Sequence, residues 1–189
     1  MSAFRNSGTV VTLIEDAVAG LPSVARADFL NALRHVPEPV TVVASDGPAG
    51  PGAVTVTAFS SVSADPPTVA ICLQSKGSAA SAVIENGRFT VNFLSEDDRA
   101  LAEICAGRGG GDHAARLADP GWRLSPDGLP LWGNAIAVLT CYLIEAVEIG
   151  SHRVLVAHVT EAAQGPAERP LLYCAGAYHS LGEVLEDES

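Results

Sequence analysis

Short apolar runs separated by turn-forming residues dominate this chain, and they predict more strands than helices. The runs that fit strands cover residues 40–44, 54–62, 68–73, 89–94, 135–147, 153–161 and 171–175. They are rich in Val, Ile, Thr and Phe, which favour extended backbone. Helices are predicted over 23–36, 78–85 and 95–106, and Pro37 with Pro39 would end the first of them.

The order of these elements favours a mainly β fold of the α+β type. Strands and helices do not alternate strictly, as they would in a doubly wound parallel sheet. We therefore expect an antiparallel barrel with a few peripheral helices. A length of 189 residues suits one domain. That domain is expected over residues 23–185, with residues 1–22 as an N-terminal appendage.

Charge and cysteine content narrow the classes of partner. The chain has 11 basic and 22 acidic residues, a net charge of −11, whereas nucleic-acid binding needs clustered Lys and Arg. The most apolar stretch, 135–147, contains Thr140 and Glu145 and is too short to cross a bilayer. We therefore expect neither a nucleic-acid nor a membrane partner. The four cysteines form no Cys-x-x-Cys pair and have apolar neighbours, which predicts free thiols and a cytoplasmic location.

Residues 52–63 combine small and hydroxyl side chains at a density that a plain core strand does not need. The segment reads Gly-Ala-Val-Thr-Val-Thr-Ala-Phe-Ser-Ser-Val-Ser, and Pro66-Pro67, which cannot donate to a ladder, would end the strand soon after it. Hydroxyls and exposed N–H groups on extended backbone suit a flat, polar-rimmed ring system and a phosphate. The alternative is a barrel strand whose hydroxyls face water, and the segment alone does not decide between the two.

A second candidate segment joins a predicted buried strand to a predicted helix. Lys76 is the only lysine of the chain and lies between Ser75 and Ser78. A helix N-terminus with hydroxyls and an ammonium group favours anions, although a solvated loop lysine is the plain alternative. Arg108 lies among glycines after another predicted helix, within reach of a second phosphate or simply in water.

Histidines and glycine motifs exclude some chemistries. His152 begins a predicted strand and His158 lies six residues later on the same face, but no third ligand has supporting spacing, so no metal site is predicted. Asp112-His113 lacks an identifiable nucleophile, and no Gly-x-Ser-x-Gly elbow occurs, so a hydrolase has little support. No Gly-x-Gly-x-x-Gly follows a strand, so a nicotinamide cofactor would not be bound in a Rossmann domain.

A set of segments in a fixed order over about residues 29–181 carries a family resemblance. They are Phe29-Leu30 with residues 40–43, residues 55–63 with Pro66-Pro67, residues 72–78, the Phe-x-Val-Asn-x-Leu run at 89–94, Gly150-Ser151-His152, and Tyr173 with Tyr178-His179. Together they resemble the flavin reductase components of two-component flavin-dependent monooxygenases. That family has the FMN-binding split β-barrel fold, with Greek-key character.

The resemblance implies a function and a site. It implies a homodimer that uses NADH or NADPH to reduce FAD or FMN by hydride transfer to flavin N5, and that supplies reduced flavin to a separate oxygenase. His152 would be the catalytic residue, beside the nicotinamide. Cofactor contacts would come from Thr55, Thr57, Ala58, Ser60, Ser61, Val62, Ser63, Ser75, Lys76, Ser78, Asn92, Cys105, Ala106, Arg108, His152 and Tyr178. The alternatives are a flavin-retaining oxidoreductase of the same fold and a non-catalytic flavin-binding or interaction barrel.

Overall fold

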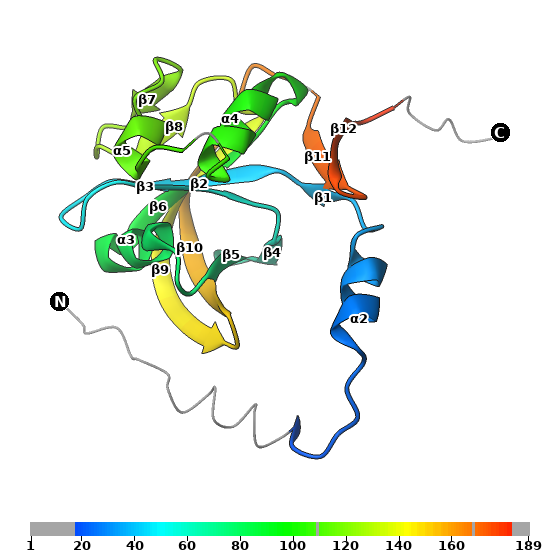
Figure 1. Ribbon diagram of the computed structural model, residues 1–189. Coiled ribbons are helices and arrows are strands. Elements are labelled where there is room, and N and C mark those ends of the chain that lie inside the picture. Colours follow the sequence, from blue (N-terminus) through cyan, green and yellow to red (C-terminus); the bar gives the residue numbers. More distant parts are fainter. Residues whose placement is uncertain (1–17, 109, 168, 183–189) are drawn as a thin grey trace.

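A seven-stranded antiparallel sheet that curls into a split barrel forms the centre of the computed structural model, which describes residues 18–108, 110–167 and 169–182 (Figure 1). Its strands are β2 (Thr41–Ser45), β3 (Gly52–Val56), β4 (Phe59–Ala64), β5 (Pro67–Gln74), β6 (Arg88–Phe93), β9 (Ala137–Ile149) and β10 (His152–Gln164). Their spatial order is β3-β2-β6-β9-β10-β5-β4. The consecutive strands β3 and β4 therefore lie at opposite edges, so the sheet has to curl for residues 57–58 to join them.

Two small sheets and four helices complete the described fold. The strands are β1 (Glu38–Pro39), β11 (Leu171–Cys174) and β12 (Ala177–Ser180) in one sheet, and β7 (Trp122–Leu124) and β8 (Pro130–Trp132) in the other. The helices are α2 (Arg26–Leu33), α3 (Ser78–Asn86), α4 (Arg99–Cys105), which follows the 3₁₀ turn η1 (Glu96–Asp98), and α5 (His113–Arg116). Within the described ranges, no helix has the length and apolar character that a bilayer crossing requires. The predicted mainly β barrel with few helices is confirmed.

The core has two parts, one on each face of β2. Val43 packs with Ile71, Phe89 and Leu155 inside the barrel. Its neighbour Val42 belongs to a second cluster, built with side chains of α4 and β11. Successive side chains of a strand point to opposite faces, so the mostly apolar run 40–44, in which Thr41 is also buried, reflects burial on both sides.

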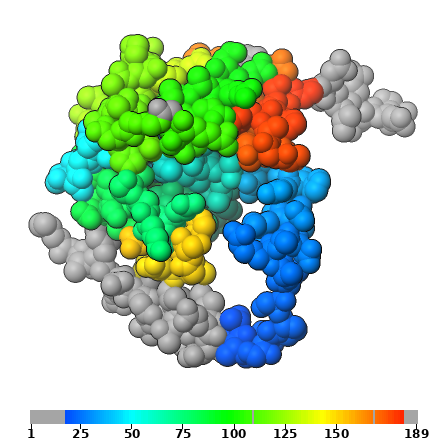
Figure 2. Space-filling model, viewed as in Figure 1, coloured from blue at the N-terminus to red at the C-terminus, as the bar shows by residue number. Residues whose placement is uncertain are grey.

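Helix α2 stands apart from this core. None of its residues is buried, and Figure 2 shows residues 18–36, in blue, extending away from the body of the molecule. The side chains of Phe29, Leu33 and Val36 are each about half exposed. The division of the chain at residues 22 and 23 stays a prediction, because residues 1–17 lie outside the described part.

The structure corrects the predicted strand over 54–62. It is two strands, β3 and β4, because the chain turns at residues 57–58, where the Phe59 N–H donates to the Thr57 carbonyl at 2.9 Å. The Ala58 carbonyl accepts from the Cys72 N–H at 3.1 Å, which attaches the turn to β5. Pro67 opens β5, a strand position that tolerates proline. The short elements α5, β7 and β8 were not predicted from the sequence.

Candidate functional site

A cleft of about 350 Å³ lies where the two edges of the barrel meet. Its lining consists of residues from β3, the turn after it, the end of β5, the start of α3, the end of α4 and the start of β10: Val54, Thr55, Val56, Thr57, Ala58, Cys72, Leu73, Gln74, Gly77, Ala79, Ala80, Ala106 and His152. Most of these side chains are small or apolar, and hydroxyls and an imidazole join them. Clefts of this size and composition bind small organic ligands.

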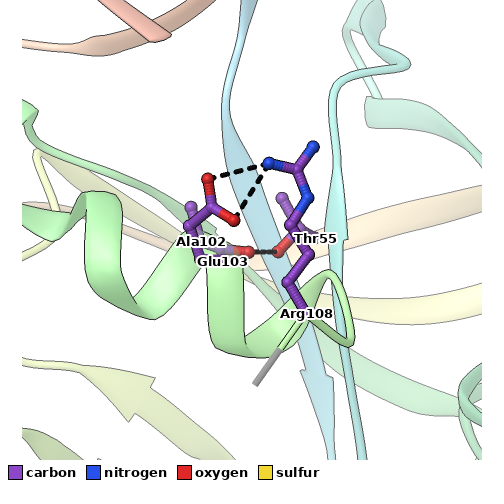
Figure 3. Close-up of polar contacts among 4 residues, drawn as sticks. All are labelled: Thr55, Ala102, Glu103 and Arg108. Carbon is purple, nitrogen blue, oxygen red and sulfur yellow. Dashed lines mark hydrogen bonds and ion pairs between the residues drawn. The ribbon is translucent and has the colours of Figure 1, made fainter. Parts of the chain in front are cut away.

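Two threonines of the hydroxyl-rich segment line the cleft, and both already donate a hydrogen bond within the protein. The Thr55 hydroxyl donates to the Ala102 carbonyl at 2.6 Å, which ties β3 to α4 (Figure 3). The Thr57 hydroxyl donates to the Glu38 carboxylate at 2.6 Å. Because each hydroxyl has one proton, these two side chains can only accept a further hydrogen bond from a ligand.

The rest of that segment lies on β4, at the edge of the sheet. The structure places Ser60, Ser61, Val62 and Ser63 there, and none of them lines the cleft. Val62 is 57% exposed. The Ser63 hydroxyl accepts from the Asp65 N–H at 3.1 Å, so its nearest partner is local.

The loop between β5 and α3 closes one end of the cleft. The Ser75 N–H donates to the Ser151 carbonyl at 3.0 Å, which joins this loop to the turn before His152. The buried Ser75 hydroxyl has no hydrogen-bond partner in the part of the chain that the structure describes. Lys76 is exposed. The loop thus combines an unsatisfied hydroxyl, a cation and the N-terminus of a nine-residue helix, all of which favour an anionic ligand group.

Ser78, the first residue of α3, has a partner that the sequence did not reveal. Its hydroxyl lies 2.7 Å from Nε2 of His113 on α5, which is 35 residues away in the chain. Burial and then the nearby Arg116 charge lower the pKa of His113. The sequence offers no signal for this contact, because Asp112-His113 shows no motif and α5 has only four residues.

Arg108 and Cys105 flank the cleft-lining Ala106. The Arg108 guanidinium donates twice to the Glu103 carboxylate, at 2.9 and 3.0 Å, as Figure 3 shows. Any anion that recruits Arg108 must therefore compete with Glu103. Cys105 is 1% exposed, and burial raises the pKa of its thiol to about 12, so it is an inert core thiol.

Asn92 and Tyr178 lie away from the cleft lining. Asn92 is fully buried, donates to the Val42 carbonyl at 3.1 Å and to Thr90, and accepts from the Trp132 N–H at 2.8 Å. These are the contacts of a core residue. Tyr178 packs edge-on against a neighbouring tyrosine of the small sheet, with the Arg99 guanidinium 5.6 Å from the centre of its ring.

His152 lies at the mouth of the cleft. It is the first residue of β10, is exposed, and its Nδ1 atom lies 2.9 Å from the Ser151 hydroxyl. His158, on the same strand, instead has Nδ1 3.0 Å from the Pro67 carbonyl. Among the described residues no group of three His, Cys, Asp or Glu side chains is placed to hold a metal ion.

The structure therefore brings five of the predicted contacts to the cleft lining: Thr55, Thr57, Ala58, Ala106 and His152. Ser75, Lys76 and Ser78 lie on the adjoining loop and helix start. The other predicted contacts lie on β4, in the core or at the rim: Ser60, Ser61, Val62, Ser63, Asn92, Cys105, Arg108 and Tyr178. The assignment of all these residues to a cofactor stays a prediction.

Known proteins of similar sequence and structure share this architecture. Residues 33–182 match the flavin reductase like domain. The FMN reductase (NADH) RutF of Ancylobacter novellus is 34% identical over 168 residues, covering 89% of this chain and 92% of that protein. The RutF of Klebsiella pneumoniae is 31% identical over 156 residues, covering 82% and 94%.

Solved structures agree with these sequence relatives. BorF, the flavin reductase component of a bacterial two-component tryptophan halogenase, superimposes with a TM-score of 0.77 at 27% identity, over 85% of this chain and all of that chain. The styrene monooxygenase flavin reductase SMOB of Pseudomonas putida S12 gives 0.74 at 28% identity, over 84% and 99%. The family resemblance seen in the sequence is thereby confirmed, and the chain belongs to the flavin reductase like family of split-barrel proteins.

Proposed function

We propose that this protein is an NAD(P)H:flavin oxidoreductase that reduces FAD or FMN and supplies the reduced flavin to a separate oxygenase. The observation that supports it most directly is the cleft at the barrel seam, which is lined by segments on which the family resemblance rests. Relatives that carry the name FMN reductase (NADH) support the same activity, and their alignment with this protein covers most of both chains.

The residues of the cleft fit a flavin. Ala58, Ala79, Ala80 and Ala106 are small, which leaves room for a flat ring system, and the buried Ser75 hydroxyl has no partner among the described residues. We assign the ring to this cleft and the phosphate to the loop that carries Lys76. The net charge of −11 makes a locally placed cation and helix N-terminus necessary for a phosphate.

The chemistry requires little of the protein. Bound dihydronicotinamide supplies a hydride and the flavin accepts it at N5. The apolar walls exclude water from the ring. Thr55 and Thr57 present acceptor lone pairs, because their protons are engaged with Ala102 and Glu38. His152, at the mouth, orients the nicotinamide and need not transfer a proton.

Two further properties belong to the proposal. A homodimer is supported by apolar side chains exposed on α2 and β9, among them Phe29, Leu33, Tyr142 and Ile144. Light scattering on the purified protein should give twice the chain mass. A cytoplasmic location is supported by the four free thiols, which reducing conditions preserve.

The test is oxidation of NADH and of NADPH with added FAD, FMN or riboflavin. We expect flavin-dependent oxidation with at least one nicotinamide. Failure to bind any flavin at micromolar concentration would make the non-catalytic barrel the better hypothesis. A tightly held flavin that NAD(P)H does not reduce would favour the flavin-retaining alternative.

His152→Ala tests the site. Stopped-flow reduction should be slower, by up to about 100-fold for the loss of one positioning contact, and its NADH dependence should shift. Flavin affinity should stay within twofold of the parent. His35→Ala, on the exposed N-terminal segment, is the matched control and should change neither. A parental rate and NADH dependence in His152→Ala would remove His152 from the nicotinamide site.

A further inference from the structure

The pair formed by Ser78 and His113 lies at the end of the cleft to which the phosphate is assigned. Ser78 stands between Gly77 and Ala79, which both line the cleft. Its hydroxyl is 2.7 Å from His113 Nε2. The imidazole is half-buried, with Nε2 beside Ser78 of α3 and Nδ1 beside Ala53 of the edge strand β3, so contacts at both ring nitrogens set its position.

The surroundings of the other ring nitrogen determine which nitrogen carries the proton. Nδ1 of His113 faces two donors, the Ala53 N–H at 3.3 Å and the Arg116 guanidinium at 3.3 Å. The Ala53 carbonyl, 3.1 Å from Nδ1, already accepts from Arg116 at 2.9 Å, and Nη1 of Arg116 also donates to the Cys105 carbonyl at 3.3 Å. A lone pair on Nδ1 accepts from the Ala53 N–H and faces the Arg116 cation, whereas a proton there would oppose the Ala53 N–H and point toward that cation. We therefore assign the proton to Nε2, from this hydrogen-bond network.

This assignment separates the pair from a hydrolase dyad. In a Ser-His-Asp site the imidazole accepts the serine proton at Nε2, and a carboxylate stabilises the imidazolium through Nδ1. Here Nε2 donates, and a cation stands where the carboxylate would be. Burial and the Arg116 charge lower the pKa of His113, so the ring is neutral at neutral pH.

The consequence is a hydroxyl prepared as a donor. Ser78 accepts from His113, so its own proton is not needed for that contact and remains available to another group. A donor beside a cation-bearing loop suits an anionic oxygen rather than a metal ion or an ammonium group. The phosphate shared by FMN and FAD has such oxygens, and riboflavin lacks it.

We propose that His113 is a positioning residue for the flavin phosphate, and that it acts by fixing the Ser78 hydroxyl as a donor to that phosphate. The inference rests on the proposed function. His113 itself does not line the cleft and would act through Ser78. Arg116 supports it by occupying the Ala53 carbonyl and by keeping Nδ1 unprotonated.

Two substitutions of His113 separate this role from a merely structural one. The side-chain amide introduced by His113→Gln reaches the place of Nε2 and can donate to Ser78, whereas the shorter side chain in His113→Asn reaches only the place of Nδ1. Dissociation constants for FMN and riboflavin are measured by quenching of flavin fluorescence. We expect His113→Asn to weaken FMN binding about tenfold or more, as the loss of a charge-assisted hydrogen bond does. Riboflavin binding should weaken less than twofold. His113→Gln should keep FMN affinity within about threefold.

Coupling between the two residues is the second arm. Ser78→Ala should match His113→Asn, and the double variant should be no worse than either single one, because both remove the same contact. Ser81→Ala, on an exposed turn of α3, is the control and should bind FMN as the parent does. Equal weakening of FMN and riboflavin, or additive losses in the double variant, would overturn the proposal.

A measurement on the parent protein keeps the proposal testable if a variant does not fold. Nitrogen-15 chemical shifts of the His113 ring should report a neutral Nε2–H tautomer at pH 7.5, and an Nδ1–H tautomer would refute the assignment. The failures are distinguishable. If the parent binds no flavin, the proposed function is overturned as well. If the parent reduces FMN and riboflavin but the variants lose affinity for both equally, only the role of His113 is overturned.

Discussion

Asn92→Ala should be costly for folding and nearly silent for ligand binding. Asn92 is fully buried, and its amide joins three elements through the Val42 carbonyl, the Thr90 hydroxyl and the Trp132 N–H. Thr90 keeps other partners at the Ala44 and Pro130 carbonyls. The Val42 carbonyl keeps its backbone ladder, because β2 pairs with both β3 and β6. The Trp132 N–H loses its partner, and one unsatisfied buried group costs about 1–3 kcal/mol. That is an appreciable share of the stability of an ordinary domain, about 5–15 kcal/mol.

The assay pairs urea denaturation, followed by circular dichroism, with FMN titration at a temperature where the variant is folded. Asn31→Ala, on exposed α2, is the control and should stay within about 0.5 kcal/mol of the parent. The FMN dissociation constant of Asn92→Ala should stay within twofold, because Asn92 does not line the cleft. A tenfold weaker FMN complex with less than about 1 kcal/mol of lost stability would refute this reasoning and restore Asn92 as a cofactor contact.

Three other outcomes are expected. Glu103→Gln should release Arg108 and lower the FMN dissociation constant about threefold. The Tm should change little, because exposed ion pairs contribute little to folding stability, and weaker FMN binding would contradict this prediction. Bound FMN should slow alkylation of the cleft-lining Cys72 thiol about tenfold or more and leave the alkylation rate of Cys174 unchanged. Equal Cys72 rates with and without FMN would mean that the flavin binds elsewhere. Burial lowers the pKa of His113, so its stabilising contribution is complete above the unfolded value of about 6.5 and lost as pH falls below it. The free energy of unfolding should therefore fall more steeply between pH 7 and pH 5 for the parent than for His113→Gln. The same pH dependence in both proteins would count against this.

The strands that could be predicted are those whose burial leaves a mark in the sequence. The apolar run 68–73 became β5, and the alternating run 89–94 became β6. The break at residues 57–58 could not be predicted, because Val56, Thr57 and Phe59 all favour extended backbone and a single alanine does not mark a turn. It is imposed by a distant contact, the Cys72 N–H on the Ala58 carbonyl. The hairpin of β7 and β8 has strands of three residues, too short for a periodic signal.

The site divides in the same way. Thr57 and His152 stand out locally, by hydroxyl density and by position at a strand start, and the structure brings both to the cleft. The partner that limits Thr57 is distant in sequence, because the Glu38 carboxylate accepts the hydrogen bond that the Thr57 hydroxyl donates. The hydrogen bond between Ser78 and His113 spans 35 residues and two short elements. One sequence contains propensities and spacing but no record of which side chains meet, so contacts of this kind appear only in the structure.

The two-residue turn that joins the opposite edges of the sheet has a kinetic consequence. A ligand in the cleft beside it lies between β3 and the end of β5, whose ladders to β2 and β10 are complete without it. Departure therefore breaks only the contacts of the ligand itself, and no strand pair has to separate. The dissociation rate can then be tuned by single side chains at the rim while the unfolding rate stays with the core. For the proposed supply of reduced flavin to an oxygenase, the cleft separates the lifetime of the flavin complex from the lifetime of the fold.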